Sequence, residues 1–292
     1  MFGVIAAVPT PVDDQGEPVI SPFLSHCSWV LKNGCDGINI LGSTGEANSF
    51  GTSQRQLIMS SAAEKLDIQK LMVGTGTPSL SETIYLTKFA SNHGYKVALV
   101  LPPFYYKPLK NNGLFLWYQT LHEKLENHKI KIYFYNFPQM TGFTIPIEVI
   151  EDLNRQWPER FSGIKDSSGD LDYCRRLSKN ENFKVFPSSE VSILEAHKSN
   201  FSGCISATTN QTLFLSSEAW IKRSENINAL ILKIKKIREQ ISSESLIPSI
   251  KYLVSVQTKD KTWQNILPPL NAINKSRRLE LDAIHNQLLS SE

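Results

Sequence analysis

The sequence predicts a (β/α)₈ barrel followed by a C-terminal helical extension. Eight short apolar runs each end in Gly, Pro, Ser or Thr, and most are separated by segments of helical character. Strands that alternate with helices form a parallel sheet. Eight such units over most of a chain of 292 residues fit the usual size of a barrel.

The predicted elements follow one another in a regular order. Strands are expected at residues 3–11, 37–45, 70–76, 96–103, 131–138, 161–168, 183–189 and 203–209. Helical segments are expected at 53–66, 80–94 and 113–128, and further helices at 217–241 and 275–289. We therefore expect the barrel over residues 1–212 and the extension over residues 213–292, packed together as a single structural unit. An open doubly wound sheet is the alternative, but the first strand lacks a Gly-rich dinucleotide fingerprint, and "GTGTPS" at 74–79 is too short to be one.

Composition excludes several classes of protein. Charged residues make up 20% of the chain, the net charge is +3, and no long block of like charge suggests a nucleic-acid surface. No apolar run approaches the roughly 20 residues that span a bilayer, and the apolar N-terminus lacks the basic segment of a signal peptide. We therefore expect a cytoplasmic protein that binds neither nucleic acid nor membrane.

Cysteine and histidine spacing argues against a metal site. The four cysteines are scattered without a CxxC pair, so we expect reduced, buried thiols rather than disulfides or a zinc site. The six histidines form no HxH or HxxxH pattern, which disfavours a metal-dependent aldolase. The sequence thus predicts neither a metal nor a cofactor.

The sixth predicted strand carries an unusual lysine. Lys165 follows an apolar run in "FSGIKDSS", and a buried lysine is rare without a partner or a role. Side chains alternate along a strand, so Phe161, Gly163 and Lys165 are expected on one face and Ile164 on the other. If Ile164 packs outward, Lys165 points into the barrel, and Gly163 leaves space beside it. A weakly solvated interior favours the neutral amine, which is a nucleophile.

Three motifs resemble those of the dihydrodipicolinate synthase and N-acetylneuraminate lyase family. These are "GSTGE" at 42–46, "YNFP" at 135–138 and "GIKD" at 163–166, at the ends of the second, fifth and sixth strands. "LPPFYYKP" and "GCISATTN" fit the fourth and eighth strand ends of that family, and the similarity covers roughly the whole chain. The resemblance implies a class I aldolase or lyase that acts on pyruvate or a related 2-oxo acid.

The resemblance also implies roles for individual residues. Lys165 would form a Schiff base with the 2-oxo acid, and Tyr135 would carry the proton. Thr44 would link Tyr135 to a tyrosine of a neighbouring subunit, Tyr105 or else Tyr106, in a homotetramer. The residues expected to bind the substrate are Ser43, Thr44, Gly45, Ile205 and Ser188.

One departure from the family pattern bears on the substrate. Synthases of the lysine precursor carry an arginine five positions after the tyrosine, and this chain has Met140 there. Methionine cannot bind a carboxylate, so the pattern favours an aldolase of 2-oxo-3-deoxy sugar acids, with Ser188, Ser189 and Glu190 near the hydroxyl groups. A dihydrodipicolinate synthase that uses Lys107 instead, a dehydratase, and a non-catalytic 2-oxo acid sensor remain alternatives.

Overall fold

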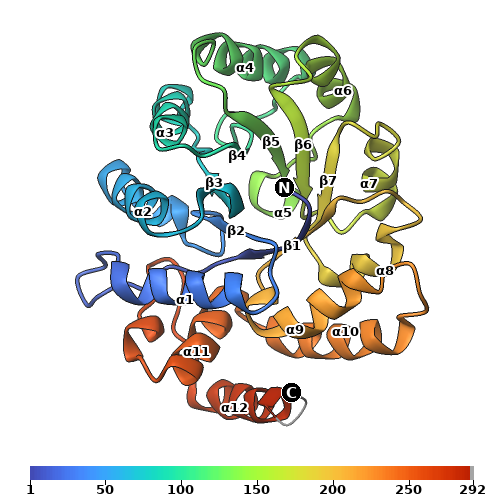
Figure 1. The fold of residues 1–292 in the computed structure, drawn as a ribbon. Coiled ribbons are helices and arrows are strands. Elements are labelled where there is room, and N and C mark those ends of the chain that lie inside the picture. Colours follow the sequence, from blue (N-terminus) through green and yellow to red (C-terminus); the bar gives the residue numbers. More distant parts are fainter. Residues whose placement is uncertain (290–292) are drawn as a thin grey trace.

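The structure, a computed structural model, describes residues 1–289. Eight parallel strands form one sheet in the order β7-β6-β5-β4-β3-β2-β1-β8, and helices surround it (Figure 1). The strands are β1 (Gly3–Ala7), β2 (Gly37–Ile40), β3 (Leu71–Gly74), β4 (Val97–Val100), β5 (Lys131–Asn136), β6 (Phe161–Asp166), β7 (Lys184–Pro187) and β8 (Gly203–Ser206). Every predicted strand is present, and the predicted barrel is confirmed.

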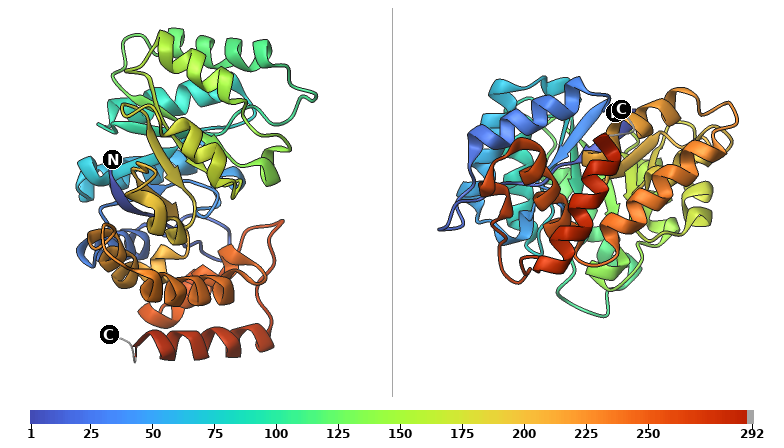
Figure 2. Two further views of the ribbon diagram at one scale, coloured as in Figure 1. Left: turned by 90° about the vertical axis from the view of Figure 1, so that its right-hand side faces the viewer. Right: turned by 90° about the horizontal axis from the view of Figure 1, so that it is seen from below.

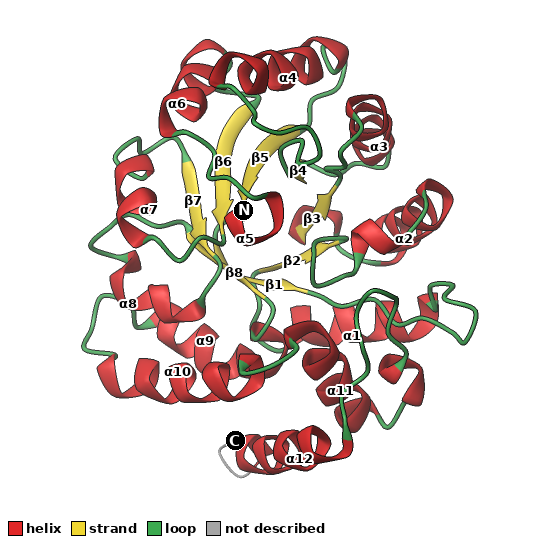
Figure 3. Cartoon of the chain, turned by 180° about the vertical axis from the view of Figure 1, so that it is seen from behind, coloured by secondary structure: helices red, strands yellow, loops and turns green. Residues whose placement is uncertain are grey.

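Apart from the short α5, which lies across the middle of the ring in this view, the helices lie outside the strands (Figure 3). The α-helices are α1 (Ile20–Lys32), α2 (Thr52–Lys65), α3 (Leu80–Asn92), α4 (Asn111–Lys124), α5 (Pro138–Thr141), α6 (Ile147–Gln156), α7 (Leu171–Leu177), α8 (Ile193–Ala196), α9 (Thr209–Ile221), α10 (Asn228–Ser242), α11 (Leu246–Thr258) and α12 (Lys275–Leu289). Short 3₁₀ helices are η1 (Ala47–Ser49), η2 (Ile68–Lys70), η3 (Glu190–Ser192) and η4 (Lys261–Gln264). Polar side chains cap the N-termini of several helices. Asp170, for example, accepts hydrogen bonds from the N–H groups of Asp172 and Tyr173 at the start of α7.

The barrel closes between β7 and β8. The N–H of Ser202 donates to the carbonyl of Val185 at 2.8 Å, and β8 pairs with β1 on its other side. The pairing with β1 requires glycine at position 203, where a Cβ atom would lie 1.8 Å from the carbonyl oxygen of Gly3. Its φ of +145° is also a value that other residues rarely adopt.

The strands separate two apolar layers. The outer layer packs between strands and helices, and the inner layer fills the barrel. The inner layer consists of Ile5, Ala7, Met72, Val97, Leu99, Leu101, Tyr133, Tyr135, Phe186 and Ile205. Because both faces of each strand are buried, the strands are almost continuously apolar in sequence.

A bulge in β6 corrects one expectation. The register against β5 shifts between Ile132 and Tyr133, which pair with Phe161 and Gly163. The extra residue turns Phe161 outward, onto the helix side with Ile164, instead of onto the face of Lys165. Gly163 does face the interior, but the space beside it is occupied, because a Cβ there would lie 2.9 Å from the ring of Tyr133.

The extension packs along one side of the barrel, with α12 at the edge of the molecule (Figure 2). It has its own apolar cluster of Ala207, Ile237, Ile241, Ile250, Leu253, Val254, Trp263, Leu281 and Ile284. Helix α10 also contributes Ile231 and Ile234 to the outer layer of the barrel. The expected boundary at residue 212 falls inside α9, so we propose instead that the extension begins after this helix.

Two smaller expectations can also be compared with the structure. All four cysteines are free and buried, as expected. None of the helices within residues 1–289 combines the length and hydropathy that a membrane span requires.

Candidate active site

Lys165 and Tyr135 are paired neighbours at the carboxyl ends of β6 and β5. The Nζ atom of Lys165 lies 4.6 Å from the centroid of the Tyr135 ring, and the lysine is only 4% exposed. Within residues 1–289, no carboxylate forms an ion pair with Lys165. The lysine therefore enters the barrel as expected, without an acidic partner to hold it as a spectator ammonium.

Ser43 contacts the hydroxyl of Tyr135. The Ser43 Oγ and Tyr135 Oη atoms are 3.3 Å apart, whereas Thr44 makes no side-chain hydrogen bond with the described residues. The structure thus gives Ser43 the place beside Tyr135 that the sequence analysis gave to Thr44. Ser43 lies in a tight turn that follows Leu41, whose backbone is left-handed with φ of 52°.

The same turn offers two unpaired amides. The N–H of Gly45 donates to the carbonyl of Gly42 at 3.1 Å, so it is used within the turn. The N–H groups of Ser43 and Thr44 have no acceptor among residues 1–289, and successive free amides of this kind bind carboxylates. Gly45 contributes through its small size, because a Cβ there would lie 3.2 Å from the carbonyl oxygen of Val8.

The other expected site residues form two groups: Ile205 and Ser188 belong to the strands or their ends, whereas Tyr105 and Tyr106 are exposed at the surface. Ile205 is part of the inner layer, and Ser188 follows β7, with its N–H donating to the carbonyl of Asp166 at 2.8 Å. Tyr105 and Tyr106 are 74% and 82% exposed, with their rings edge to face at 5.2 Å. Neither tyrosine forms a hydrogen bond with the turn or with Tyr135 in its own chain.

Two side chains at the rim bear on the second substrate. Met140 in α5 is exposed and supplies no charge. Lys107, in the loop after β4, extends toward the end of α5, where a Cβ on Gly142 would lie 2.2 Å from its Nζ atom. The Lys107 cation therefore lies next to Gly142, which is two residues after Met140 in the chain.

A polar group on the outer face fixes the two strand ends. The Nδ2 atom of Asn136 donates to Asp166 at 2.6 Å, and the hydroxyl of Ser168 donates to the other carboxylate oxygen at 2.8 Å. Burial raises the pKa of Asp166, and these hydrogen bonds offset part of that rise. Because Asn136 and Asp166 directly follow Tyr135 and Lys165, the bond between them aligns the ends of the two strands that carry Tyr135 and Lys165.

The sequence analysis missed three buried polar residues near the strand ends. Lys251 in α11 forms an ion pair with Glu46, and both side chains are fully buried. Asn39 on β2 is also fully buried, and neither polar atom of its side chain has a partner in the described residues. Lys251 had a usable signal, since it interrupts the apolar run "SIKYLV" just as Lys165 interrupts its own.

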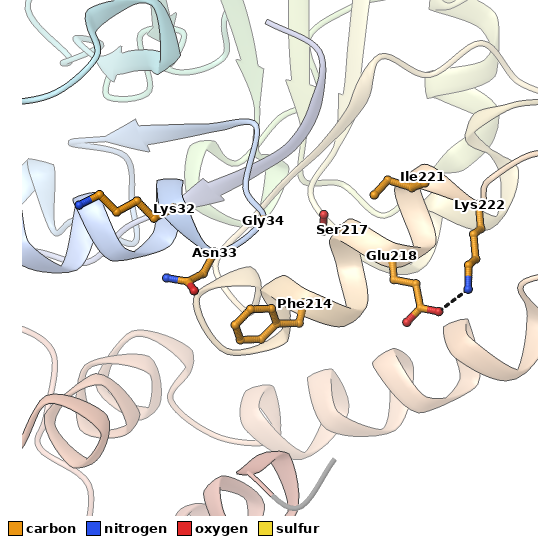
Figure 4. A pocket seen from close by; sticks show the side chains of 8 residues that line it. All are labelled: Lys32, Asn33, Gly34, Phe214, Ser217, Glu218, Ile221 and Lys222. Atoms are coloured by element: carbon orange, nitrogen blue, oxygen red, sulfur yellow. Dashed lines mark hydrogen bonds and ion pairs between the residues drawn. The ribbon is translucent and has the colours of Figure 1, made fainter. Parts of the chain in front are cut away.

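Hollows elsewhere on the surface lie apart from this centre. One of about 420 Å³ lies between the end of α1 and helix α9, and Figure 4 shows its lining, including the ion pair of Lys222 and Glu218. Its Gly34 precedes β2, so this pocket is at the end of the barrel where strands begin, opposite to Lys165. Within residues 1–289, no group of three or more His, Cys, Asp or Glu side chains is placed to hold a metal ion.

The fold and the site define a lyase of the Schiff-base class. A buried lysine without an acidic partner at the carboxyl end of a barrel strand, beside a tyrosine, has the arrangement that imine chemistry requires. The model of the dihydrodipicolinate synthetase family matches residues 1–288. The chain belongs to this family.

Similar proteins cover the chain from end to end. An uncharacterized DapA-like lyase of Chloroflexus aurantiacus is 25% identical, over 99% of this chain and 97% of that protein. The crystal structure of dihydrodipicolinate synthase from Agrobacterium tumefaciens is 27% identical, with a TM-score of 0.90 over 99% of both chains. A prophage protein of the same family from E. coli K12, solved with pyruvate, shares the fold at 21% identity, with a TM-score of 0.87 over 99% of both chains.

Proposed function

We propose that Lys165 is the residue that forms the imine with a 2-oxo acid. The observation that carries this proposal is the absence of an ion-pairing carboxylate around a lysine that is 4% exposed. The amine adds to the C2 carbonyl and water leaves, which gives a protonated imine. The imine withdraws electrons from the bond between C3 and C4, so that this bond can break without a metal.

Tyr135 is the proton carrier of the proposed reaction. During cleavage the C4 hydroxyl gives its proton to the tyrosine oxygen as an aldehyde leaves, and the remaining enamine takes up a proton at C3. Water then hydrolyses the imine, which releases pyruvate and the free amine of Lys165. Ser43, at 3.3 Å from Tyr135, is the hydroxyl that relays the proton.

The substrate carboxylate is expected at the turn after β2. The unpaired amides of Ser43 and Thr44 are suitable donors, and the turn lies beside Tyr135 through the Ser43 contact. Ile205 would contact the carbon chain of the substrate from the interior, and Ser188 its far end. Thr44 acts in this proposal through its backbone.

Assembly completes the proton path. A tyrosine as exposed as Tyr105 has lost little of its surface to its own chain and is free to enter another subunit. Tyr105 of the partner subunit would reach the Ser43 and Tyr135 pair, which requires at least a dimer, and a tetramer built from two dimers is the state we expect.

A neutral or hydroxylated aldehyde fits the rim better than an acidic one. Met140 offers no hydrogen-bond donor where a carboxylate would bind. A sugar-acid aldolase is therefore the function we favour. Lys107 keeps the dihydrodipicolinate synthase as a second candidate, because its Nζ atom lies near the end of α5.

Borohydride reduction in the presence of pyruvate tests the central assignment. The peptide that contains Lys165 should gain the mass of the reduced adduct. Tyr135→Phe should keep this labelling and slow turnover by about 10²- to 10⁴-fold, since it removes proton transfer and leaves the nucleophile. Labelling of another lysine, or of none, would show that the assignment is wrong.

Two assays separate the remaining alternatives. Release of pyruvate from a panel of 2-oxo-3-deoxy sugar acids identifies an aldolase, whereas loss of water from them without pyruvate identifies a dehydratase. Efficient conversion of pyruvate and aspartate semialdehyde to the cyclic lysine precursor would favour the synthase. A protein that is labelled at Lys165 and turns over none of these compounds would be a sensor.

Subunit exchange tests the role of Tyr105. Lys165→Ala and Tyr105→Phe are each expected to be impaired. In a mixed dimer, a site with intact Lys165 can receive the intact Tyr105 of the partner subunit, so part of the activity should return. No recovery after verified exchange would confine each site to one chain.

A further inference from the structure

The turn after β2 ends in an acidic residue with an unusual backbone. Glu46 has a left-handed conformation, with φ of 54°, which few residues other than glycine, asparagine and aspartate adopt readily. Its N–H donates to the carbonyl of Ser43 at 3.1 Å, so Glu46 closes the turn that presents the two free amides. A long charged side chain at such a position needs a reason in the surrounding structure.

The carboxylate of Glu46 is held entirely by the C-terminal extension. The Nζ atom of Lys251 donates to Oε1 at 2.5 Å, and the N–H of Leu267 donates to Oε2 at 2.9 Å. Both charged side chains are fully buried. More than 200 residues separate Glu46 from Lys251 in the chain, so this contact is a direct link between the extension and the turn.

The turn is held from its other side as well. The hydroxyl of Thr10 donates to the carbonyl of Gly45 at 3.0 Å, from the loop after β1. That loop is itself tied to the extension, because the Nδ2 atom of Asn265 donates to the carbonyl of Val12 at 3.0 Å. The turn is therefore connected twice to the segment after α11: directly through Leu267, and indirectly through the loop after β1, which Asn265 holds.

We propose that Glu46 and Lys251 are positioning residues for the 2-oxo acid carboxylate, through which the C-terminal extension sets the substrate-binding turn. The proposal rests on the proposed function, because that function assigns the amides of Ser43 and Thr44 to the carboxylate. Neither Glu46 nor Lys251 touches the substrate. The ion pair fixes the direction of the amides before the substrate binds, so that binding does not have to order them.

The physical argument for a positioning role is that a buried ion pair is a poor source of stability. Removing two charges from water costs about as much as their attraction returns, and apolar pairs of similar size are often as stable. A charged pair does, however, enforce one geometry, because each charge left without its partner is costly. In this structure the pair of Glu46 and Lys251 fixes the conformation of the turn that contains Ser43.

The test measures the pyruvate concentration that gives half-maximal borohydride labelling of Lys165. Labelling requires only pyruvate, so the unknown aldehyde does not enter. Glu46→Gln and Lys251→Met should each raise this concentration by about 10²-fold, with labelling at saturation preserved because Lys165 is intact. Arg277→Met is the matched control, since Arg277 binds the carbonyls of Gln240 and Ile241 within the extension, away from the turn. It should leave the pyruvate dependence unchanged.

The double variant separates positioning from stability. Glu46→Gln combined with Lys251→Met contains no unpaired buried charge, so its thermal midpoint should recover. Its pyruvate dependence should stay weakened, because the tether is still absent. Recovery of both properties, or normal pyruvate dependence in the single variants, would overturn the proposal. Absence of labelling in the unmodified protein would instead refute the proposed function.

Discussion

Two buried lysines, Lys165 and Lys251, arise from the same kind of sequence and differ in their surroundings. Each interrupts an apolar run, and they are 4% and 0% exposed. Lys165 has an aromatic ring beside it and no ion-pairing carboxylate in the described part of the chain, whereas the Nζ atom of Lys251 lies 2.5 Å from a carboxylate oxygen of Glu46. Burial marks both lysines as unusual, and we infer that the presence or absence of an acidic partner separates a structural lysine from a reactive one.

The two environments affect the amines differently. Burial lowers the pKa of Lys251, and Glu46 offsets part of that change, so the pair keeps its charge in place. Within the described residues Lys165 has no carboxylate in an ion pair with it, and in our proposal it is the amine that attacks the carbonyl. The same substitution at the two positions should therefore produce different defects: loss of turnover at Lys165, and loss of stability at Lys251.

The largest expected effect is on catalysis. Lys165→Met should reduce turnover by about 10⁴-fold or more, because no other group can supply the imine. Its free energy of unfolding should stay within about 1 kcal/mol of the unmodified protein, since the side chain that is lost has no ion-pairing partner among the described residues. Urea titration and an assay of pyruvate release measure the two quantities. Retained turnover in Lys165→Met would show that Lys165 does not form the imine.

Lys251→Met should lower the stability of the fold, in addition to its expected effect on the pyruvate dependence. It leaves the carboxylate of Glu46 buried with only the N–H of Leu267 as a donor. The free energy of unfolding should fall by about 3–5 kcal/mol, as for other buried charges that lose a partner. A urea titration monitored by circular dichroism measures this loss. A variant as stable as Lys165→Met would show that Glu46 does not depend on the extension.

The buried side chain of His26 allows a test of how burial affects a basic group, because it should make the stability of the fold depend on pH. Its Nε2 atom lies 2.9 Å from Asn210 Oδ1, and its Nδ1 atom is buried without a hydrogen-bond partner among residues 1–289. Burial lowers its pKa to about 4, only partly offset by Asn210. Below its ordinary pKa of about 6.5 the unfolded chain binds the proton and the folded chain does not, so stability falls with pH down to about 4.

The expected loss from His26 is about 2 kcal/mol between pH 7 and pH 5. Urea titrations of the unmodified protein and of His26→Gln at both values measure it. Between pH 7 and pH 5 the free energy of unfolding of His26→Gln should fall by about 2 kcal/mol less than that of the unmodified protein. An equal loss in the two proteins would mean that His26 takes up a proton in the folded state without cost.

The smallest effect concerns the other buried carboxylate held by the extension, Glu190. It accepts hydrogen bonds from Ser206, Thr208, Thr212 and Arg238. Burial alone would raise its pKa, but Arg238 and the hydroxyls hold it below the ordinary value. Thr212→Val should therefore cost only about 1 kcal/mol, because the other donors remain. A loss as large as that of Lys251→Met would show that the donors act as one unit.

The sequence by itself determined most of the architecture. Alternating strands and helices predicted every strand of the barrel, because parallel strands are buried on both faces and their apolar runs stand out. The motifs around Tyr135 and Lys165 were found because polar residues at the ends of such runs can only meet at one edge of the barrel. The second buried lysine had the same local signal and went unnoticed.

Only the tertiary structure decided which groups are partners. The bulge in β6 that turns Phe161 outward depends on the register against β5. The contact between Ser43 and Tyr135 joins residues 92 positions apart, on the turn after β2 and on β5. The pairing of Glu46 with Lys251 joins residues more than 200 positions apart, and no local pattern encodes it. Periodicity reports which face of an element is buried, whereas a contact between distant side chains exists only once the elements have packed.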